Sequence, residues 1–337
     1  MQERKGIISA GNWIIDHLKM IDSWPDRGNL SNIRTVAGNA LGGCSHNVLV
    51  DLARLQTGLP LWAGGIVGDD SDGATIMNEI KKYGIDSRYM SVHQGVTTSF
   101  TDVMTEMQTG VRTFFHYRGA NALLGYPDFV NMDTTAKIFH LGYLLLLDTL
   151  DATDAEDGTV AAKVLRLLKT KGYATSIDVV SEQGDRFRSI VTPSLRYVDY
   201  MICNEVEAGA CTGIELRNDA NGLISENLPK AAQYLFEKGV ASMVVIHYPE
   251  GGFAMRRTGE QLFADSFAVP SSDIKSTVGA GDAFCAGALY AIHEGWPLSD
   301  LLTLANANAR FILLSESSTG GAVPLQQVQA YISTFNK

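Results

Sequence analysis

The chain has 337 residues and a formal net charge of −10, with 45% hydrophobic and 19% charged side chains. This is the composition of a globular protein with a substantial core, and it excludes a disordered chain. The negative charge argues against a protein that coats nucleic acid or binds an anionic membrane surface. No apolar run approaches the ~20 residues of a membrane-spanning helix and we find no secretory signal, so we expect a cytoplasmic protein without nucleic-acid or membrane partners.

Strand and helix patterns alternate along most of the chain. Short apolar segments predict buried strands at residues 6–10, 61–67, 138–142, 174–180, 200–203 and 243–247. Amphipathic helices are predicted over residues 71–84 and at the apolar stripes Val160/Val164/Leu168 and Ala232/Leu235/Phe236. Such alternation is typical of βαβ units. We therefore predict an α/β fold with a Rossmann-like, mainly parallel sheet and helices on both faces.

Two segments break this alternation. Residues 30–42 and 96–117 have the polar alternation of strands, and no helix separates the strands within the second segment. They predict an antiparallel patch apart from the main sheet. The economical assembly is a single domain over residues 1–337, in which a lid sheet from about 12–42 and 91–121 covers an α/β body made by the remainder.

The most informative motif lies near the C-terminus, where Gly279-Ala280-Gly281 leads into a helix of small residues with Asp282 in its first turn. Backbone N–H groups at a helix N-terminus form an anion site, and glycines let the backbone approach a ligand closely. An acid beside a bound anion makes sense if it takes a proton from a hydroxyl that attacks a phosphorus held by the turn. The alternative is an acidic cap on a buried helix.

A second motif, Asn204-x-x-Glu207, follows the predicted strand at 200–203. Taken alone, it is typical of a capping box, in which the asparagine caps a helix and the acid three residues on bonds back to it. Its place at the carboxyl end of a strand favours a role in ligand binding instead, because ligands of open α/β sheets bind there.

Windows in a fixed order give the chain a resemblance to a known family. They are Gly42-Gly-Cys-Ser-His-Asn47, Gly65-Ile-Val-Gly-Asp-Asp70, Gly119-Ala-Asn121, Asn204-Glu-Val-Glu207, Gly279-Ala-Gly-Asp282 and Ala305-Asn-Ala-Asn-Ala309. Together they resemble the ribokinase-like, or PfkB, carbohydrate kinases over about residues 11–324. The resemblance implies an ATP-dependent kinase that transfers a phosphoryl group to a hydroxyl of a small sugar or sugar-like acceptor.

The resemblance also implies roles for the two motifs. Asp282 would be the general base, and the N–H groups of Gly279, Ala280 and Gly281 would stabilise charge on the transferred group. Asn204 and Glu207 would organise Mg²⁺ near the ATP phosphates, with Glu207 acting on the metal through water.

The remaining implied site residues hold the acceptor and the nucleotide. Asp16 would accept vicinal sugar hydroxyls, with Asn12 as a weaker candidate nearby; the alternative for Asp16 is a solvated loop acid. The other wall of the acceptor site would be formed by Gly42, Gly43 and Asn47. On the nucleotide side the matching positions are Asn204, Glu207, Gly252 and Asn306. Arg112 and Arg118 each have two possible roles. Each is an exposed charge on the sheet, or its side chain reaches a carboxylate or phosphate of the substrate.

Several positions depart from the family pattern. Ser276 stands where the family usually has an aspartate, which leaves activation by a monovalent cation in doubt. The adenine-side loop over residues 247–252 matches cleanly only at Gly252. Gly142-Tyr143 replaces the region of the ribokinase glutamate, and the identity of the acceptor stays open. The four cysteines have no metal-type spacing and are expected to be free and buried.

Other functions remain to be weighed. A nucleoside kinase of the same fold would need an aromatic slab for the base, which Trp13, Phe100 or Phe115 could supply. A dinucleotide enzyme should have Gly-x-Gly-x-x-Gly after the first strand, where this chain has Gly11-Asn-Trp13. A non-catalytic nucleotide-binding protein should have lost the base, and Asp282 is present.

The lid predicts an oligomeric state. Its strands carry apolar side chains that would pack well against a second copy, namely Phe100, Val103, Phe114 and Tyr117. We expect a homodimer joined through the lid.

Overall fold

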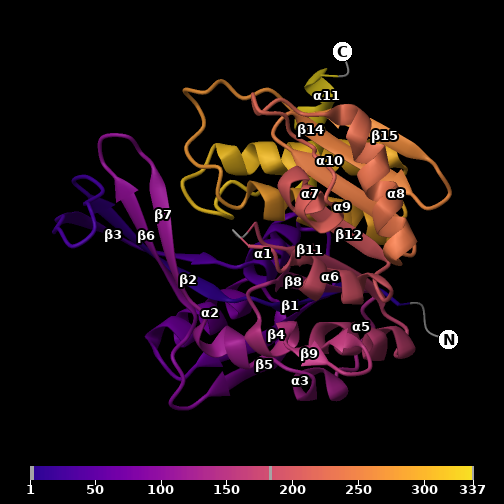
Figure 1. Ribbon diagram of the computed structural model, residues 1–337, viewed down its shortest axis with the longest axis horizontal. Helices are drawn as coiled ribbons and strands as arrows, with labels where there is room; N and C mark the ends of the chain where they lie inside the picture. The colour runs from indigo at the N-terminus through magenta and orange to yellow at the C-terminus, as the bar shows by residue number, and fades with distance from the viewer. Residues whose placement is uncertain (1–3, 182–183, 336–337) are drawn as a thin grey trace.

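A twisted, mainly parallel sheet forms the centre of the molecule in the computed structural model, which describes residues 4–181 and 184–335 (Figure 1). Its strand order is β15-β14-β13-β12-β11-β8-β1-β4-β5. The strands are β1 (Ile7–Gly11), β4 (Leu61–Gly68), β5 (Asp86–His93), β8 (Ile138–Leu144), β11 (Ala174–Val179), β12 (Tyr200–Asn204), β13 (Met243–Tyr248), β14 (Gly251–Arg256) and β15 (Gln261–Asp265). Neighbouring strands from β5 to β13 pair in parallel, and β14 and β15 continue the sheet antiparallel.

The predicted α/β fold is confirmed. Each of the predicted strands is present with ends that differ by at most two residues, as β1, β4, β8, β11, β12 and β13. The predictions missed β5, β14 and β15, which lie at the two ends of the sheet. Edge strands keep partly exposed, polar residues, as in β5 and β15, and so lack the continuous apolar run of a central parallel strand.

Helices cover both faces of the sheet. They are α1 (Cys44–Arg54), α2 (Ser71–Lys82), α3 (Pro127–Val130), α4 (Asp148–Asp151), α5 (Val160–Thr170), α6 (Phe187–Leu195), α7 (Glu205–Thr212), α8 (Leu228–Lys238), α9 (Ala280–Glu294), α10 (Leu298–Leu313) and α11 (Leu325–Phe335). Buried side chains of α1, α2, α9, α10 and α11 share one core cluster, and those of α5, α6 and α8 share the other. Short strands β9 (Thr153–Asp154) and β10 (Gly158–Thr159) form a separate hairpin before α5.

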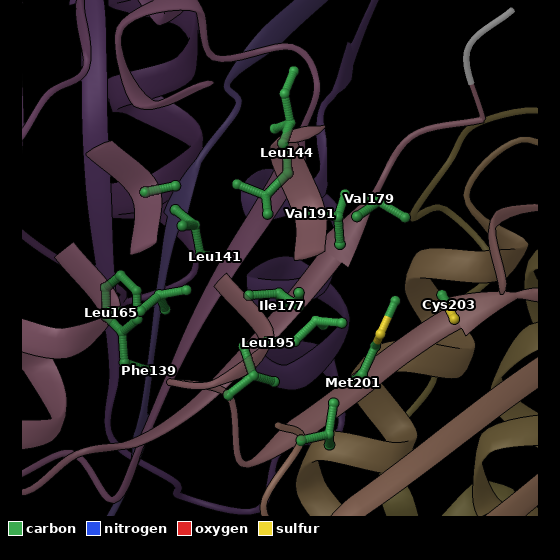
Figure 2. Close-up of a cluster of buried hydrophobic side chains, with 14 of the residues drawn as sticks. Phe139, Leu141, Leu144, Leu165, Ile177, Val179, Val191, Leu195, Met201 and Cys203 are labelled. Carbon is green, nitrogen blue, oxygen red and sulfur yellow. The ribbon is translucent and has the colours of Figure 1, made fainter. Parts of the chain in front are cut away.

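Figure 2 shows part of the second core cluster, where apolar side chains of the sheet meet those of two helices. Phe139 and Leu141 project from β8 and Ile177 from β11, opposite Leu165 of α5 and Leu195 of α6. All five are at most 1% exposed. Burying each such side chain stabilises the fold by ~1.5–3 kcal/mol, so the central strands are held firmly and position their carboxyl ends precisely.

The lid is a separate sheet that projects from the body at the left of Figure 1. Its order is β3-β2-β6-β7, with β2 (Ile14–Ile21), β3 (Ile33–Gly42), β6 (Phe100–Glu106) and β7 (Arg112–Tyr117). The outer pairs are antiparallel as predicted, but the central pair β2–β6 is parallel, because both strands leave the body at the same end. Residues 91–93 belong to β5 of the body, so the lid is narrower than the predicted ranges. The predicted domain over 1–337 includes residues 1–3, 182–183 and 336–337, which lie outside the described residues.

Two family-like windows tether the lid to the body. Asn121 pairs with both backbone groups of Trp13, accepting from its N–H and donating to its carbonyl. Asp70 caps α2 through the Gly73 N–H and also accepts from the backbone and hydroxyl of Thr98. These buried bonds fix the points where the chain enters β2 and β6.

Pairing register gives the lid two distinct faces. Asp16 is opposite Thr101, and Val103 is opposite Phe114, so these side chains share the inner face. Phe100 and its partner Tyr117 lie on the outer face. The apolar residues expected to meet a second copy are thus divided between the two faces, Val103 and Phe114 on the inner one and Phe100 and Tyr117 on the outer one, because alternation along a strand separates residues an odd number apart.

All four cysteines are free and buried, as expected. Within residues 4–181 and 184–335, the helices are all too short or too polar to cross a bilayer.

Candidate active site

Polar side chains gather where the central strands end at their carboxyl edge. Asn12 follows β1, Tyr143 lies near the end of β8, Asp178 near the end of β11, and Asn204 at the end of β12. The N-terminus of α9 brings Asp282 to the same edge. This is the edge at which open α/β sheets bind ligands.

Asp282 is almost fully buried, and each of its carboxylate oxygens has a defined partner. The Asn47 side-chain amide donates to Oδ2 at 2.8 Å, and the Tyr143 hydroxyl donates to Oδ1 at 2.5 Å. Asn47 is held in turn by the Ser318 hydroxyl, which donates to Asn47 Oδ1 at 3.0 Å. These contacts fix the carboxylate and leave further lone pairs to accept a proton.

The environment sets the basicity of this carboxylate. Burial raises the pKa of Asp282 to about 6, while the bonds from Tyr143 and Asn47 lower it. The group is therefore ionised at neutral pH but more basic than an exposed aspartate. A pKa near the working pH is the range that suits a general base.

The turn before α9 has the form of an anion cradle. Gly279 has φ +83° and caps the helix without a side chain, so the first amides of α9 receive no capping side-chain bond. A Cβ at Gly279 would lie 2.2 Å from the Ser318 carbonyl oxygen, and one at Gly281 would lie 3.0 Å from the His247 ring. Only glycine fits at 279. No side chain caps the first turn, so its N–H groups can face a ligand, although that of Ala280 also donates a long hydrogen bond of 3.3 Å to the Thr277 carbonyl oxygen.

Asp16 lies in lid strand β2, not in a loop just after the first strand. It faces Gly42 at the base of the lid, where an added Cβ would lie 2.8 Å from Asp16 Oδ2. At Gly43 a Cβ would meet the Asn12 carbonyl oxygen at 2.5 Å. The paired glycines therefore let the Asp16 carboxylate and the Asn12 backbone pack directly against the start of α1, and their role in an acceptor site stays a prediction. Burial raises the pKa of Asp16 to about 6.

A small cavity of about 40 Å³ lies between the inner face of the lid and the body. Its lid residues include Asp16, Val103, Arg112 and Phe114, and its body residues include Val278 and Ser318. Arg112 crosses from the lid and donates to the Ser276 hydroxyl at 3.3 Å. The cavity therefore contains one guanidinium, from β7 of the lid, and two carboxylates, those of Asp16 in β2 and of Glu316 in the body.

Asn12 is fully buried beneath this region. Its side-chain oxygen accepts from the Tyr143 backbone N–H, whereas its Nδ2 has no protein partner. A buried amide donor without a partner is costly unless a ligand or water supplies an acceptor.

Asn204 and Glu207 form a complete capping box at the start of α7. The Glu207 N–H donates to Asn204 Oδ1 at 2.8 Å, and the Asn204 N–H donates to Glu207 Oε2 at 2.9 Å. The other oxygen, Oε1, accepts from the Ser181 hydroxyl at 2.8 Å. Burial, with a smaller contribution from the nearby Asp282 charge, raises the pKa of Glu207 to about 7. These hydrogen bonds fix the orientation of the Glu207 carboxylate.

A larger cavity of about 500 Å³ lies on the other side of the turn. Its walls include Asn204, Tyr248, Ala280, Gly281, Asn306 and Arg310. Asn306 also donates to the carbonyl oxygens of Ala264 and Asp265. Gly252 lies behind the wall, where a Cβ would meet Phe284 at 2.9 Å, so its role is to let that ring pack rather than to touch a ligand. The volume and the adjacent anion cradle fit a nucleoside triphosphate.

Sequence reasoning missed two residues of this site. Tyr143 was noted only as a departure from the family, although its hydroxyl contacts Asp282. Ser181 binds both the Glu207 carboxylate and the Asn204 side-chain amide. Each belongs to a strand end far along the chain from its partner, and no local spacing pattern signals such a contact.

Comparisons with known proteins agree with this geometry. The family profile described as pfkB family carbohydrate kinase matches residues 9–324. A 5-dehydro-2-deoxygluconokinase of Clostridium perfringens is 25% identical over 301 residues, covering 87% of this chain and 83% of that protein.

Solved structures show the same fold. Arabidopsis thaliana ribokinase, complexed with ribose and ATP, aligns with a TM-score of 0.78 and 20% identity over 98% of this chain and 99% of that chain. An Escherichia coli protein solved with ATP and Mg²⁺ aligns with a TM-score of 0.74 and 18% identity, again over 98% and 99% of the two chains. The chain thus belongs to the pfkB family of carbohydrate kinases and is a phosphotransferase with an alcohol group as acceptor.

Proposed function

We propose that the protein transfers the γ-phosphoryl group of ATP to a hydroxyl of a small sugar acid. Asp282 acts as the general base, and the amides of residues 279–281 stabilise the transferred group. The observation that carries this proposal is the position of the turn between two cavities. Ala280 and Gly281 line the larger one, Val278 lines the smaller one, and Asp282 follows directly.

The two cavities would hold the two substrates of the reaction. The acceptor would lie in the smaller cavity with one hydroxyl directed at Asp282, and ATP in the larger one with its phosphates at the N-terminus of α9. As the hydroxyl attacks, its proton passes to the carboxylate, and the N–H groups of the turn meet the growing negative charge. The lid excludes water, which would otherwise compete as the attacking group.

A magnesium ion fits the acidic side of this arrangement. Glu207 and Asp282 are both buried, and the Asp282 charge helps burial to raise the pKa of Glu207, so a cation would relieve that repulsion. When bound, Mg²⁺ would neutralise charge on the ATP phosphates. Glu207 would hold it through water, since its own oxygens are already hydrogen-bonded. Ser276 supplies no carboxylate for a monovalent cation.

Arg112 supports an anionic acceptor. It is the guanidinium of the smaller cavity, and it faces the space beside Asp16 that a sugar would fill. A planar guanidinium binds a carboxylate in a bidentate manner. The name 5-dehydro-2-deoxygluconokinase, carried by the relatives, denotes an acceptor of the gluconate type. We infer that Arg112 binds the acid group while Asp16 binds hydroxyls.

This assignment predicts a selective defect in an Arg112→Gln variant. We expect kcat/KM for sugar acids to fall by ~10–100-fold, the loss of one charged hydrogen-bonded contact, and kcat/KM for neutral sugars to change little. An ADP-release assay across sugar acids, neutral sugars, polyols and nucleosides measures both. Lys19→Gln, on the outer face of the same sheet, is the matched control. Equal losses on acidic and neutral acceptors would contradict the carboxylate role.

A nucleoside kinase of the same fold remains the second candidate. Phe114 on the inner face of the lid is 57% exposed and could stack on a base. The same assay panel decides between them, because turnover on a nucleoside above that on every sugar acid would replace the present proposal. A non-catalytic nucleotide-binding role is disfavoured by the carefully oriented Asp282.

We also propose that the protein is a homodimer joined through the outer face of the lid. Trp24 stacks on Phe115 there, and both rings and Tyr117 are about half exposed. The inner face must stay free for the acceptor, so the outer aromatic patch is the surface left for a second copy.

Light scattering on the purified protein should therefore give the mass of a dimer at micromolar concentration. A Phe115→Glu variant should be monomeric, because a charge in an apolar interface is costly. Val92→Glu is the matched control, because Val92 is equally exposed but lies on β5 of the body. A monomeric wild-type protein, or a dimer that survives Phe115→Glu, would refute this interface.

A further inference from the structure

Directly behind the Tyr143–Asp282 pair lies a buried cluster that the proposed reaction does not use. Cys44 is the first residue of α1, His140 lies in the middle of β8, and Asp178 lies near the end of β11. All are at most 5% exposed. One potential ligand atom from each lies within 4.8 Å of the other two.

The distances in this cluster match the edges of a tetrahedral metal site. Cys44 Sγ lies 3.3 Å from His140 Nε2 and 3.9 Å from Asp178 Oδ2. For zinc, metal–sulfur bonds of about 2.3 Å and metal–nitrogen or metal–oxygen bonds of about 2.1 Å place neighbouring ligand atoms about 3.6 Å apart. The two edges that meet at Cys44 Sγ are therefore within a few tenths of an ångström of those of a zinc site, and the remaining edge, between His140 and Asp178, is at most 4.8 Å.

A hydrogen bond to a neighbouring side chain already orients the imidazole ring of His140. His140 Nδ1 lies 3.0 Å from the Ser176 hydroxyl, so this nitrogen has a hydrogen-bond partner while Nε2 faces the thiol. Metal-binding histidines are typically fixed through the other ring nitrogen in this way. The Cys285 thiol of α9 lies 3.8 Å from the same Nε2 and is placed to supply a fourth ligand.

The electrostatics of the cluster favour a cation. Burial lowers the pKa of His140 to about 3, so its ring is neutral and keeps a lone pair. Burial, and the charges of Glu207 and Asp282, raise the pKa of Asp178. Burial, and next the Asp178 charge, raise the pKa of Cys44. The neutral imidazole and the acidic groups lack a compensating positive charge, and a bound metal ion would supply it.

We propose that Cys44, His140 and Asp178, with Cys285 as the fourth ligand, form a buried site for a divalent transition metal of the zinc type. The mixed sulfur, nitrogen and oxygen ligands exclude Mg²⁺, which prefers oxygen alone. The site is therefore distinct from the proposed magnesium site at Glu207. On binding, the thiols and the Asp178 carboxyl lose any protons to solvent, and His140 donates the lone pair of Nε2.

A metal ion bound at this site would influence catalysis through the backbone that carries Tyr143. Gly142 packs between its ligands, since a Cβ there would lie 2.4 Å from Cys44 Sγ and 3.3 Å from Asp178 Cβ. The next residue is Tyr143, which holds Asp282. A bound ion would join α1, β8 and β11 and so stiffen the backbone that carries this tyrosine.

The test is metal analysis of the whole protein, isolated from zinc-supplemented culture and dialysed against Mg²⁺. We expect about one zinc per chain, and cobalt substitution should give sulfur-to-metal charge-transfer absorption. Cys44→Ser and His140→Ala should bind zinc at least ~10-fold more weakly. Cys211→Ser, another buried thiol, and Glu207→Gln, in the proposed magnesium site, should retain it.

Thermal unfolding supplies a second readout that is independent of activity. Zinc should raise the Tm of the wild-type protein and of Cys211→Ser but not of Cys44→Ser. The cysteine variant changes a single atom, so it decides the question even if His140→Ala does not fold. A folded wild-type protein that binds no zinc, or equal zinc binding by Cys44→Ser, would overturn the proposal, and neither result would bear on the kinase activity.

Discussion

Replacing Asp282 by asparagine should lower kcat by ~10²–10⁴-fold, the usual contribution of a general base. The substitution preserves size and can keep the hydrogen bond from Asn47, but the amide cannot take the proton of the attacking hydroxyl. ATP should still bind, because the cavity and the turn are unchanged. ADP release under saturating substrates measures the first effect, and nucleotide titration by calorimetry measures the second.

Tyr143→Phe is the informative partner variant, since the tyrosine positions the base but does not replace it. Its hydroxyl bond lowers the pKa of Asp282, so its loss should raise that pKa and leave much of kcat intact at high pH. A protein with Asp282→Asn that turns over at nearly the wild-type rate would remove the base from the mechanism.

The same carboxylate predicts the pH dependence. With its pKa raised to about 6, Asp282 is the ionised base above that pH and is protonated below it. We therefore expect kcat/KM to fall as the pH drops through about 6, by a factor that approaches tenfold per pH unit. In Tyr143→Phe this acidic limb should move to higher pH, and in Asp282→Asn it should be absent from the residual activity.

A feature could be predicted from the sequence when the residues that form it are close together along the chain. The turn at 279–282 and the Asn204-x-x-Glu207 box were predictable because all their atoms come from neighbouring residues. Central strands such as β8 and β12 were predictable because burial on both faces makes them continuously apolar. The box also shows that two interpretations can hold together: Asn204 and Glu207 cap a helix at the place proposed for the metal.

The missed features are those that only tertiary structure creates. Tyr143 reaches Asp282 across 139 positions of sequence, and Cys44 reaches His140 across 96. The strand that carries Asp16 was not predicted, because β2 begins almost at once after β1 and no turn or helix pattern separates the two. In the lid, the residue pattern predicted strands but not their register, so it could not show that Phe100 and Phe114 lie on opposite faces.

Removal of Mg²⁺ should abolish turnover altogether, because phosphoryl transfer needs the charge of the ATP phosphates neutralised. EDTA should give no measurable ADP release, and added Mg²⁺ or Mn²⁺ should restore it. Recovery with Mg²⁺ alone would assign the requirement to the phosphate-binding metal rather than to the buried cysteine–histidine cluster, whose ligands are poor for that ion.

Glu207→Gln separates the metal role of this residue from its capping role. Glutamine also completes a capping box, so the free energy of unfolding should change little. The loss of charge should raise the Mg²⁺ concentration needed for half-maximal rate by ~10–100-fold, as for other outer ligands of a metal. Asn204→Ala gives the converse control, since it removes the helix cap and should cost ~1 kcal/mol of stability. If Glu207→Gln keeps the wild-type Mg²⁺ dependence, Glu207 is a helix cap alone, and the metal must be held by another group at this edge of the sheet.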